Sequence, residues 1–362
     1  MKNTILKFRQ VIVLLVFCIV LSVSSSAFLK LNNLINVLWS ISTTGIIAVM
    51  ATFIIINGKI DLSVGSTVAL SAIVVVKLVM EQAWNIPAAI VVGLLSGAAV
   101  GAVNGLIVTC TKVPDFIATF CMSTLLTGVS QLLTGGKTVS AMSNKAYTAL
   151  GNGKLWKIPY PILVFLAMFL LAWLLLNKTT FGRRCFLTGG NPLAARVSGI
   201  PTRRTIFLSY LLTGAAAAVS GVVLSALTQQ ATNTMGNGYE MDVIAAVVIG
   251  GTLMSGGIGS MGGTIFGVFL IDFGYSAKLL SKIKAFAQEN DIIVRYEHLK
   301  AQISSARAAR REKPRFVLAF RSEAPFVESL KQYAEKYREK LEAAAREKGA
   351  KRSDKVDKTD DK

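Results

Sequence analysis

Few residues of this chain have the types and spacing that chemistry requires. The only histidine is His298, and the four cysteines (Cys18, Cys110, Cys121 and Cys185) are scattered, without the paired spacing of a disulfide framework or a zinc site. The region before His298 therefore lacks the imidazole that usually performs acid-base work near neutral pH. We expect no metal, no redox chemistry and no catalysis within that region.

Two glycine-rich stretches resemble nucleotide-binding motifs. Gly136-Lys-Thr138 resembles the end of a phosphate-binding loop, but the first glycine of that motif would fall at Gln131. Residues 257–262 have the letters of a dinucleotide fingerprint, yet no strand-turn-helix unit or following acidic residue accompanies them. We interpret the second stretch as a helix break, and predict that this chain has no nucleotide site and binds no cofactor.

Polar groups at the ends of apolar runs are the remaining candidates. Asp61, Ser63, Glu240 and Asp242 could accept hydrogen bonds from hydroxyl groups of a solute, or contact a protein outside the membrane. The alternative is helix capping, which we favour for Asp61 and Asp242 because carboxylates stabilise helix N-termini. Asn104 could line a path, but a bond to a neighbouring backbone group is favoured.

The elements that must position these groups are membrane helices. Seven apolar runs approach or exceed the ~20 residues that cross a bilayer, at 10–29, 34–57, 62–80, 86–109, 115–135, 159–177 and 205–228. Two shorter runs, 242–255 and 261–275, are separated by glycines and suggest half-helices that meet at a break. We predict an all-α, polytopic bundle of about eight or nine spans or half-spans.

Charge divides the chain into two domains. Residues 1–275 hold 17 basic and 6 acidic residues, whereas residues 276–362 hold 22 and 14. The first part is expected to be the membrane domain, and the second a soluble, basic, mainly helical tail that is disordered from about residue 349. The run at 10–29 has the outline of a cleavable signal, but we favour an uncleaved first span.

A basic loop marks the cytoplasmic side. From Lys178 to Arg204 there are six Lys or Arg and no acidic residue, as expected of a loop on the inner face. Asn191 is a good N-cap, Pro192 suits the first helical position, and Gly199 is typical of a helix end. A helix at about 192–198 would place Leu193 and Val197 on one face, with Ala194 and Ser198 at its rim. It could dock on a partner or rest on the bilayer surface.

Glycines recur at every fourth position in the run at 86–109, at Gly93, Gly97, Gly101 and Gly105. Small residues at this spacing expose one strip of helix backbone and let a second helix approach closely in lipid. The run at 205–228 repeats the device with Gly214, Ala218 and Gly221. We predict that both strips serve helix packing.

Several blocks together resemble the membrane subunit of bacterial ribose-type ABC sugar importers. They are Gly58–Ser66, Gly101–Thr109, Lys112–Thr119, Thr180–Arg183, Gly189–Ala195, Ser198–Ile200 and Gly238–Gly251, in an order that covers residues 1 to about 271. The resemblance implies a multi-pass protein of the bacterial inner membrane that transports a monosaccharide and is not an enzyme. It also implies three partners: a cytoplasmic ATPase that binds the ATP, a periplasmic or lipid-anchored sugar-binding protein, and a second permease copy or paralogue.

The resemblance gives the basic loop a role. In that family this loop carries the helix that couples the permease to its ATPase, and the matching positions here are Gly182, Arg183, Asn191, Pro192, Ala194, Ala195, Ser198 and Gly199. Small side chains at Ala194 and Ala195 would allow close approach. A Glu at position 195 is therefore expected to abolish ATPase association without affecting membrane insertion.

Two alternatives stay open. A permease that lacks its last span, with the tail acting as a scaffold, would not transport. An ion-coupled transporter would need ionisable groups inside the membrane, for which Lys77 is almost the only candidate. The tail itself could lie on anionic membrane lipid or pair with a helix of a partner, while its acidic residues argue against nucleic-acid binding.

Overall fold

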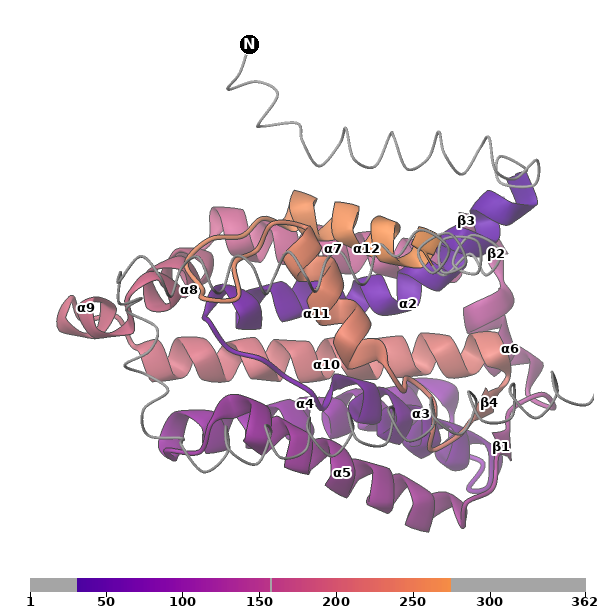
Figure 1. Ribbon diagram of the computed structural model, residues 1–362. Helices are drawn as coiled ribbons and strands as arrows, with labels where there is room; N and C mark the ends of the chain where they lie inside the picture. Colours follow the sequence, from indigo (N-terminus) through magenta and orange to yellow (C-terminus); the bar gives the residue numbers. More distant parts are fainter. Residues whose placement is uncertain (1–30, 157, 275–362) are drawn as a thin grey trace, which may run out of the picture. The chain divides into compact units, whose positions relative to one another are not determined.

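The structure, a computed structural model, describes residues 31–156 and 158–274, all within one unit of the chain. The described helices, drawn in Figure 1, are α2 (Leu31–Ile56), α3 (Val64–Met80), α4 (Ile86–Cys110), α5 (Asp115–Thr134), α6 (Lys145–Asn152), α7 (Tyr160–Lys178), α8 (Thr180–Gly190), α9 (Pro192–Val197), α10 (Thr202–Thr228), α11 (Tyr239–Ile249) and α12 (Met261–Gly274). The described strands form two antiparallel pairs, β1 (Val139–Ser140) with β4 (Gln230–Ala231) and β2 (Lys154–Leu155) with β3 (Ile158–Pro159). The predicted first span, Cys18, His298 and the tail lie outside the described residues.

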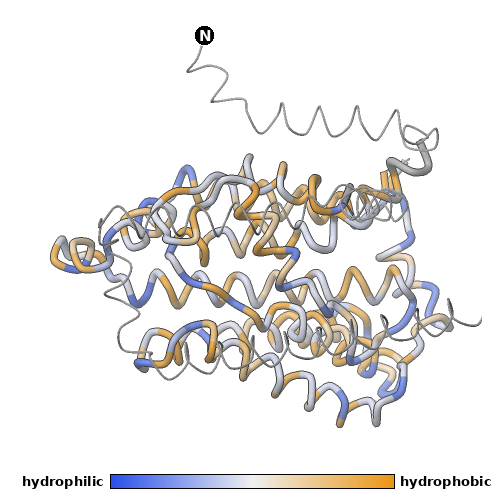
Figure 2. The backbone as a smooth tube through the Cα atoms, in the orientation of Figure 1, coloured by the Kyte–Doolittle hydropathy of each residue, from blue (hydrophilic) through white to orange (hydrophobic). Residues whose placement is uncertain are grey.

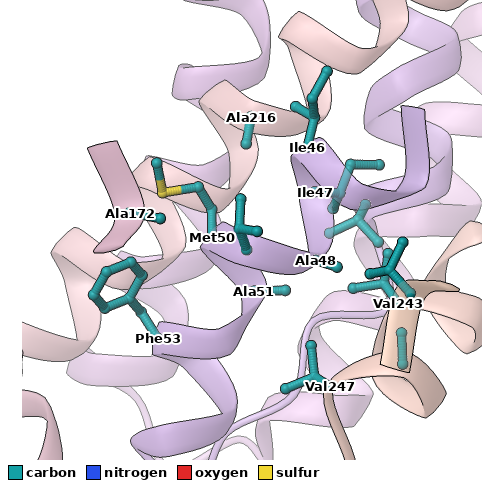
Figure 3. Packing of buried hydrophobic residues seen from close by; sticks show 14 of the residues in the cluster. Ile46, Ile47, Ala48, Met50, Ala51, Phe53, Ala172, Ala216, Val243 and Val247 are labelled. Carbon is teal, nitrogen blue, oxygen red and sulfur yellow. The ribbon is translucent and has the colours of Figure 1, made fainter. Parts of the chain in front are cut away.

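Helix α2 forms the centre of the bundle. Its side chains pack against α7, α10, α11 and α12, and Ile46, Ile47 and Phe53 are fully buried (Figure 3). Helices α4, α5 and α7 are similarly apolar (Figure 2). Much of their surface, however, is exposed in the subunit. In a bilayer, exposed apolar surface meets lipid or another membrane protein, so these three helices form the outer face of the subunit, meaning the side that faces the surrounding membrane.

Helices α4 and α10 pack side by side and antiparallel. A Cβ added to Gly105 would meet Phe207 near the start of α10, and one added to Gly97 would lie 2.5 Å from the carbonyl oxygen of Gly214. Two turns further along the same face of α10, Gly221 packs against the backbone of Val68 in α3. The glycine strips therefore lie in helix contacts where two backbones meet without intervening side chains.

Some of the helices are too short to cross a bilayer. Within the described residues, five helices are long and apolar enough to span a membrane, namely α2, α4, α5, α7 and α10. The predicted span at 62–80 is instead the 17-residue α3, which begins at Val64 after the non-helical residues 57–63. The predicted half-helices are present as α11 and α12, with residues 250–260 forming the break.

One end of the bundle gathers the chain segments predicted to be cytoplasmic. Helices α8 and α9 lie at the left of Figure 1, beside the start of α10. Because α4 runs antiparallel to α10, the turn after Cys110, which contains Lys112, falls at the same end. We call this end the inner end, following the positive charge of residues 178–204.

Cysteine labelling tests this orientation. In a Cys18→Ser chain, a membrane-impermeant maleimide should label the exposed Cys110 only in inside-out vesicles. A cysteine in place of Trp156, which is 97% exposed at the tip of the β2–β3 hairpin at the opposite end, should be labelled only in right-side-out vesicles. The reverse pattern would invert the orientation.

Candidate functional site

Helix α9 begins and ends as predicted. The Asn191 side chain accepts hydrogen bonds from the backbone N–H groups of Leu193 (3.1 Å) and Ala194 (3.0 Å), and Pro192 occupies the first turn. After the helix, Gly199 has φ +79°, a conformation that costs glycine little and other residues more. These local signals fix a rigid single-turn element between α8 and α10.

The exposed face of α9 differs from the prediction in one respect. Leu193 and Val197 are 71% and 83% exposed and share a face, and Ala194 is exposed beside them. Ala195, however, is only 5% exposed, because it faces inward, toward the chain itself. A Glu at position 195 would therefore disturb α9 itself, so Ala195→Glu does not isolate a contact with a partner.

Helix α8 was not predicted. It follows α7 immediately, with Thr179 accepting a hydrogen bond from the Gly182 N–H as its N-cap. Its buried face consists of small residues: Gly182, Cys185, Thr188 and Gly189. Arg183 and Arg184 are exposed on the other side. Burial raises the pKa of the Cys185 thiol to about 11, so that it stays protonated and unreactive at neutral pH.

The buried face of α8 lies against the end of α2 and the break between α11 and α12. A Cβ added to Gly189 would overlap the carbonyl oxygen of Ile56 and lie 2.6 Å from the nitrogen of Gly257. The Gly257 N–H also donates a hydrogen bond of 2.8 Å to the Ile56 carbonyl. We call this three-way contact of Ile56–Gly58, Gly189 and Ser255–Gly257 the inner junction.

A second site is a polar cluster on the non-helical residues 57–63, which we call the strap. The Asp61 carboxylate accepts hydrogen bonds from the Ser63 N–H (2.9 Å) and the Ser63 hydroxyl (2.7 Å). The Asn104 amide nitrogen donates to the same hydroxyl at 2.7 Å. All three side chains are buried, so the chain of bonds stabilises polar groups that would otherwise be costly at this depth.

Neighbouring helices hold the strap along its length. The Ile60 N–H donates to Asp115 (2.7 Å) and the Leu62 N–H to the hydroxyl of Thr119 (3.1 Å), both on α5. The hydroxyl of Tyr210 on α10 donates to the Ile60 carbonyl at 2.8 Å. The strap thus satisfies its backbone groups through side chains, as non-helical backbone within a membrane protein must.

These contacts correct four sequence-based interpretations. Asp61 is not the N-cap of α3, because Ser63 holds that position and Asp61 forms a turn before it. Asn104 binds a side chain rather than the backbone. Asp242 lies in the first turn of α11, whose N-cap is Gly238. Glu240 does not lie on an outer loop: it packs against Gly65 at the start of α3, and the whole length of α3 separates that position from the outer end of the helix.

Several functional contacts carried no signal in the sequence. Tyr210 and Thr43 lie in apolar runs, and Tyr239 lies just before one. All three bond across helices: the hydroxyls of Thr43 and Tyr239 are 3.2 Å apart. Asn57 donates to Ser209 at 2.9 Å, and the Cys185 sulfur lies 3.9 Å from that same hydroxyl. Only contacts between distant parts of the chain reveal these groups, so spacing along the sequence could not have found them.

An apolar cavity of about 550 Å³ lies between α4, α6, α7 and α10, but it offers little to a polar solute. Its lining includes Ile90, Leu163, Val219 and Val223, and Tyr160 supplies its polar group. A neutral polyhydroxylated solute needs hydrogen-bond partners in the membrane. The strap carries polar groups of this kind, which bond to one another within the subunit.

Substitution of Asn104 tests the strap. Asn104→Ala would leave the Ser63 hydroxyl without its buried donor and should lower the free energy of unfolding by about 1–3 kcal/mol. Asn177→Ala is the control, because Asn177 is exposed and bonds only within its own helix. Thermal unfolding of both purified variants measures the difference, and equal midpoints would show that the strap contact contributes nothing.

Comparison with known proteins gives this geometry a context. Residues 33–297 match the family described as "Branched-chain amino acid transport system / permease component". The match continues beyond residue 271, the approximate end of the resemblance inferred from the sequence. No solved structure shows a significant match to the chain.

The curated relatives include sugar import permeases. The ribose import permease protein RbsC of Bacillus subtilis (strain 168) is 38% identical over 259 residues, which cover 71% of this chain and 80% of that protein. RbsC of Escherichia coli (strain K12) is 38% identical over 275 residues, covering 75% and 85%. The galactose/methyl galactoside import permease protein MglC of Escherichia coli (strain K12) is 33% identical over 279 residues, covering 72% and 82%.

Proposed function

This chain belongs to the permease component family of ABC importers, and from that premise we propose that it forms the membrane path for a monosaccharide such as ribose. The apolar helices α2, α4, α5, α7 and α10 agree with a multi-pass membrane protein, as do its inner-membrane relatives. Proteins of this family are transporters rather than enzymes. The observation that supports a sugar most strongly is the similarity to ribose and galactose permeases along at least four fifths of their length.

The family also implies an ATPase and a substrate-binding protein as partners. We place the ATPase contact on α9, because its exposed face presents Leu193, Ala194 and Val197 on a basic, inner-end loop. A short rigid helix with an apolar face suits insertion into a cleft of a partner. The ATP would be bound by that partner and not by this chain.

The second permease copy would meet the exposed apolar faces of α4, α5 or α7, with lipid covering the remainder. Residues such as Leu95, Phe120 and Leu125 are more than half exposed in the isolated subunit. Surfaces of this kind are stable only against lipid or another membrane protein. Whether the partner is a copy or a paralogue does not alter the role of α9.

An ion-coupled mechanism has less support. Lys77, its main candidate, lies in the last turn of α3, donates to the Leu133 carbonyl at 2.7 Å and pairs with Glu81 at 3.0 Å. A lysine paired at a helix end is positioned to snorkel rather than to relay ions. A non-transporting scaffold remains the other alternative.

Sugar uptake by cells separates these functions. Cells that express this chain with its ATPase and binding protein should accumulate labelled ribose or a related monosaccharide, and omission of the ATPase should reduce uptake to background. Uptake that persists without the ATPase and disappears when the ion gradient is collapsed would favour the ion-coupled alternative. No uptake of any monosaccharide would favour the scaffold.

A further inference from the structure

The inner junction links the α8–α9 loop directly to the end of α2 and to the α11–α12 break. Helices α8 and α9 share Asn191, which ends the first and caps the second. A displacement of α9 must therefore displace α8. The neighbours that α8 contacts then determine which elements move with it.

Helix α8 contacts its neighbours through backbone, not through flexible side chains. Gly189 lies against the Ile56 carbonyl and Gly257, and a Cβ on Gly256 would lie 2.8 Å from the Gly189 carbonyl oxygen. The space that a side chain would need at these glycines is already filled by neighbouring backbone, so the segments are closely packed. A second link runs from Cys185 of α8 through the Ser209 hydroxyl to the Asn57 amide at the end of α2.

The partners of α8 lead to the polar strap and to the half-helices. Ile56 is the last residue of α2, and the strap with Asp61 and Ser63 begins directly after it. Residues 255–257 belong to the break that joins α11 to α12. The start of the strap and the α11–α12 break, both of them non-helical, thus contact α8 directly.

We propose that α8, the end of α2 and the α11–α12 break move as one body, and that this body transmits ATPase motion to the strap. This inference rests on the proposed function, since it assumes that α9 follows an ATPase. Gly189 is on this account a positioning residue: it touches neither sugar nor nucleotide, and acts by allowing the backbone contact.

Two neighbouring glycines provide a matched test. Gly189→Ala and Gly190→Ala each add one methyl group to the last turn of α8, and each raises the intrinsic helix propensity by the same amount. Only the first meets the junction, because a Cβ at Gly190 has no atom within 4 Å. Gly189→Ala should keep its ATPase on co-purification, lose sugar uptake at least tenfold, and lose the stimulation of ATP hydrolysis by sugar-loaded binding protein. Gly190→Ala should remain within twofold of the parent chain in all three.

A tethering assay needs no substitution at Gly189, and so decides the matter even when Gly189→Ala fails to insert. Cysteines replace Gly190 and Ile258, which are both exposed. The two positions are close because Ile258 follows Gly257, and a Cβ added to Gly257 would lie 2.7 Å from the Gly190 Cα. Cys18, Cys110 and Cys121 are replaced by Ser, while the unreactive Cys185 stays. Linking the pair with a short bismaleimide should leave uptake within twofold of the unlinked chain.

The outcomes separate this inference from the proposed function. A Gly189→Ala chain as active as Gly190→Ala, or a tether that stops uptake, would overturn the one-body transmission alone. A parent chain that shows no ATP-driven sugar uptake would overturn the proposed function, and this inference with it.

Discussion

A chain that carries both Leu193→Glu and Val197→Glu should insert into the membrane normally and fail to retain its ATPase. The two side chains are the most exposed apolar groups on α9, at 71% and 83%, and lie one turn apart on the same face. Burying an unpaired carboxylate in a protein contact costs several kcal/mol. We expect at least a hundredfold loss of ATPase affinity, measured by co-purification at graded ATPase concentrations.

Val113→Glu serves as the control for this pair. Val113 is also an exposed apolar residue at the inner end, in the turn between α4 and α5, but it lies outside the α8–α9 segment. It should retain the ATPase. Retention by the double α9 variant, with sugar uptake intact, would remove α9 from the coupling surface.

Gly101→Leu should strongly destabilise the membrane domain. This glycine packs against the Tyr210 carbonyl, and a Cβ added to it would lie 3.1 Å from the Cα of Leu211. Backbone atoms of α10 cannot move aside as a side chain can, so overpacking should cost about 3 kcal/mol or more. We expect a large fall in the thermal midpoint of the purified protein and rapid proteolysis.

The matched control is Gly128→Leu in α5. A Cβ at Gly128 meets nothing within 4 Å, and this glycine is exposed on the outer face of the subunit. Its midpoint should stay close to that of the parent chain. Equal midpoints for the two variants would show that α4 and α10 do not rely on the close approach of their backbones.

Local signals in the sequence predicted the parts of the structure that local physics controls. Runs of apolar residues located five long helices, and the glycine repeat lies on the packed face of α4. The Asn191 cap and the left-handed Gly199 were confirmed, because a cap depends on the side chain and backbone of a few adjacent residues. The family resemblance was likewise confirmed by comparison.

What the sequence could not predict depends on contacts between distant segments. Helix α8 contains Gly182, Gly189 and Gly190, which disfavour an isolated helix, and it forms because its small face packs on α2 and α10. The strap joins residues 61, 104, 115 and 210, which no spacing rule connects. The burial of Ala195 was missed because a single-turn helix has too few residues to reveal which face is inward.

Reconstitution tests the central claim most directly. The permease and its ATPase are placed in liposomes with ATP enclosed on the inner-end side, and sugar-loaded binding protein is added outside. The account predicts accumulation of labelled monosaccharide that requires ATP hydrolysis, is insensitive to ionophores and is absent from liposomes carrying the α9 double variant. Uptake without ATP that an ionophore abolishes, or no uptake by the intact assembly, would contradict it.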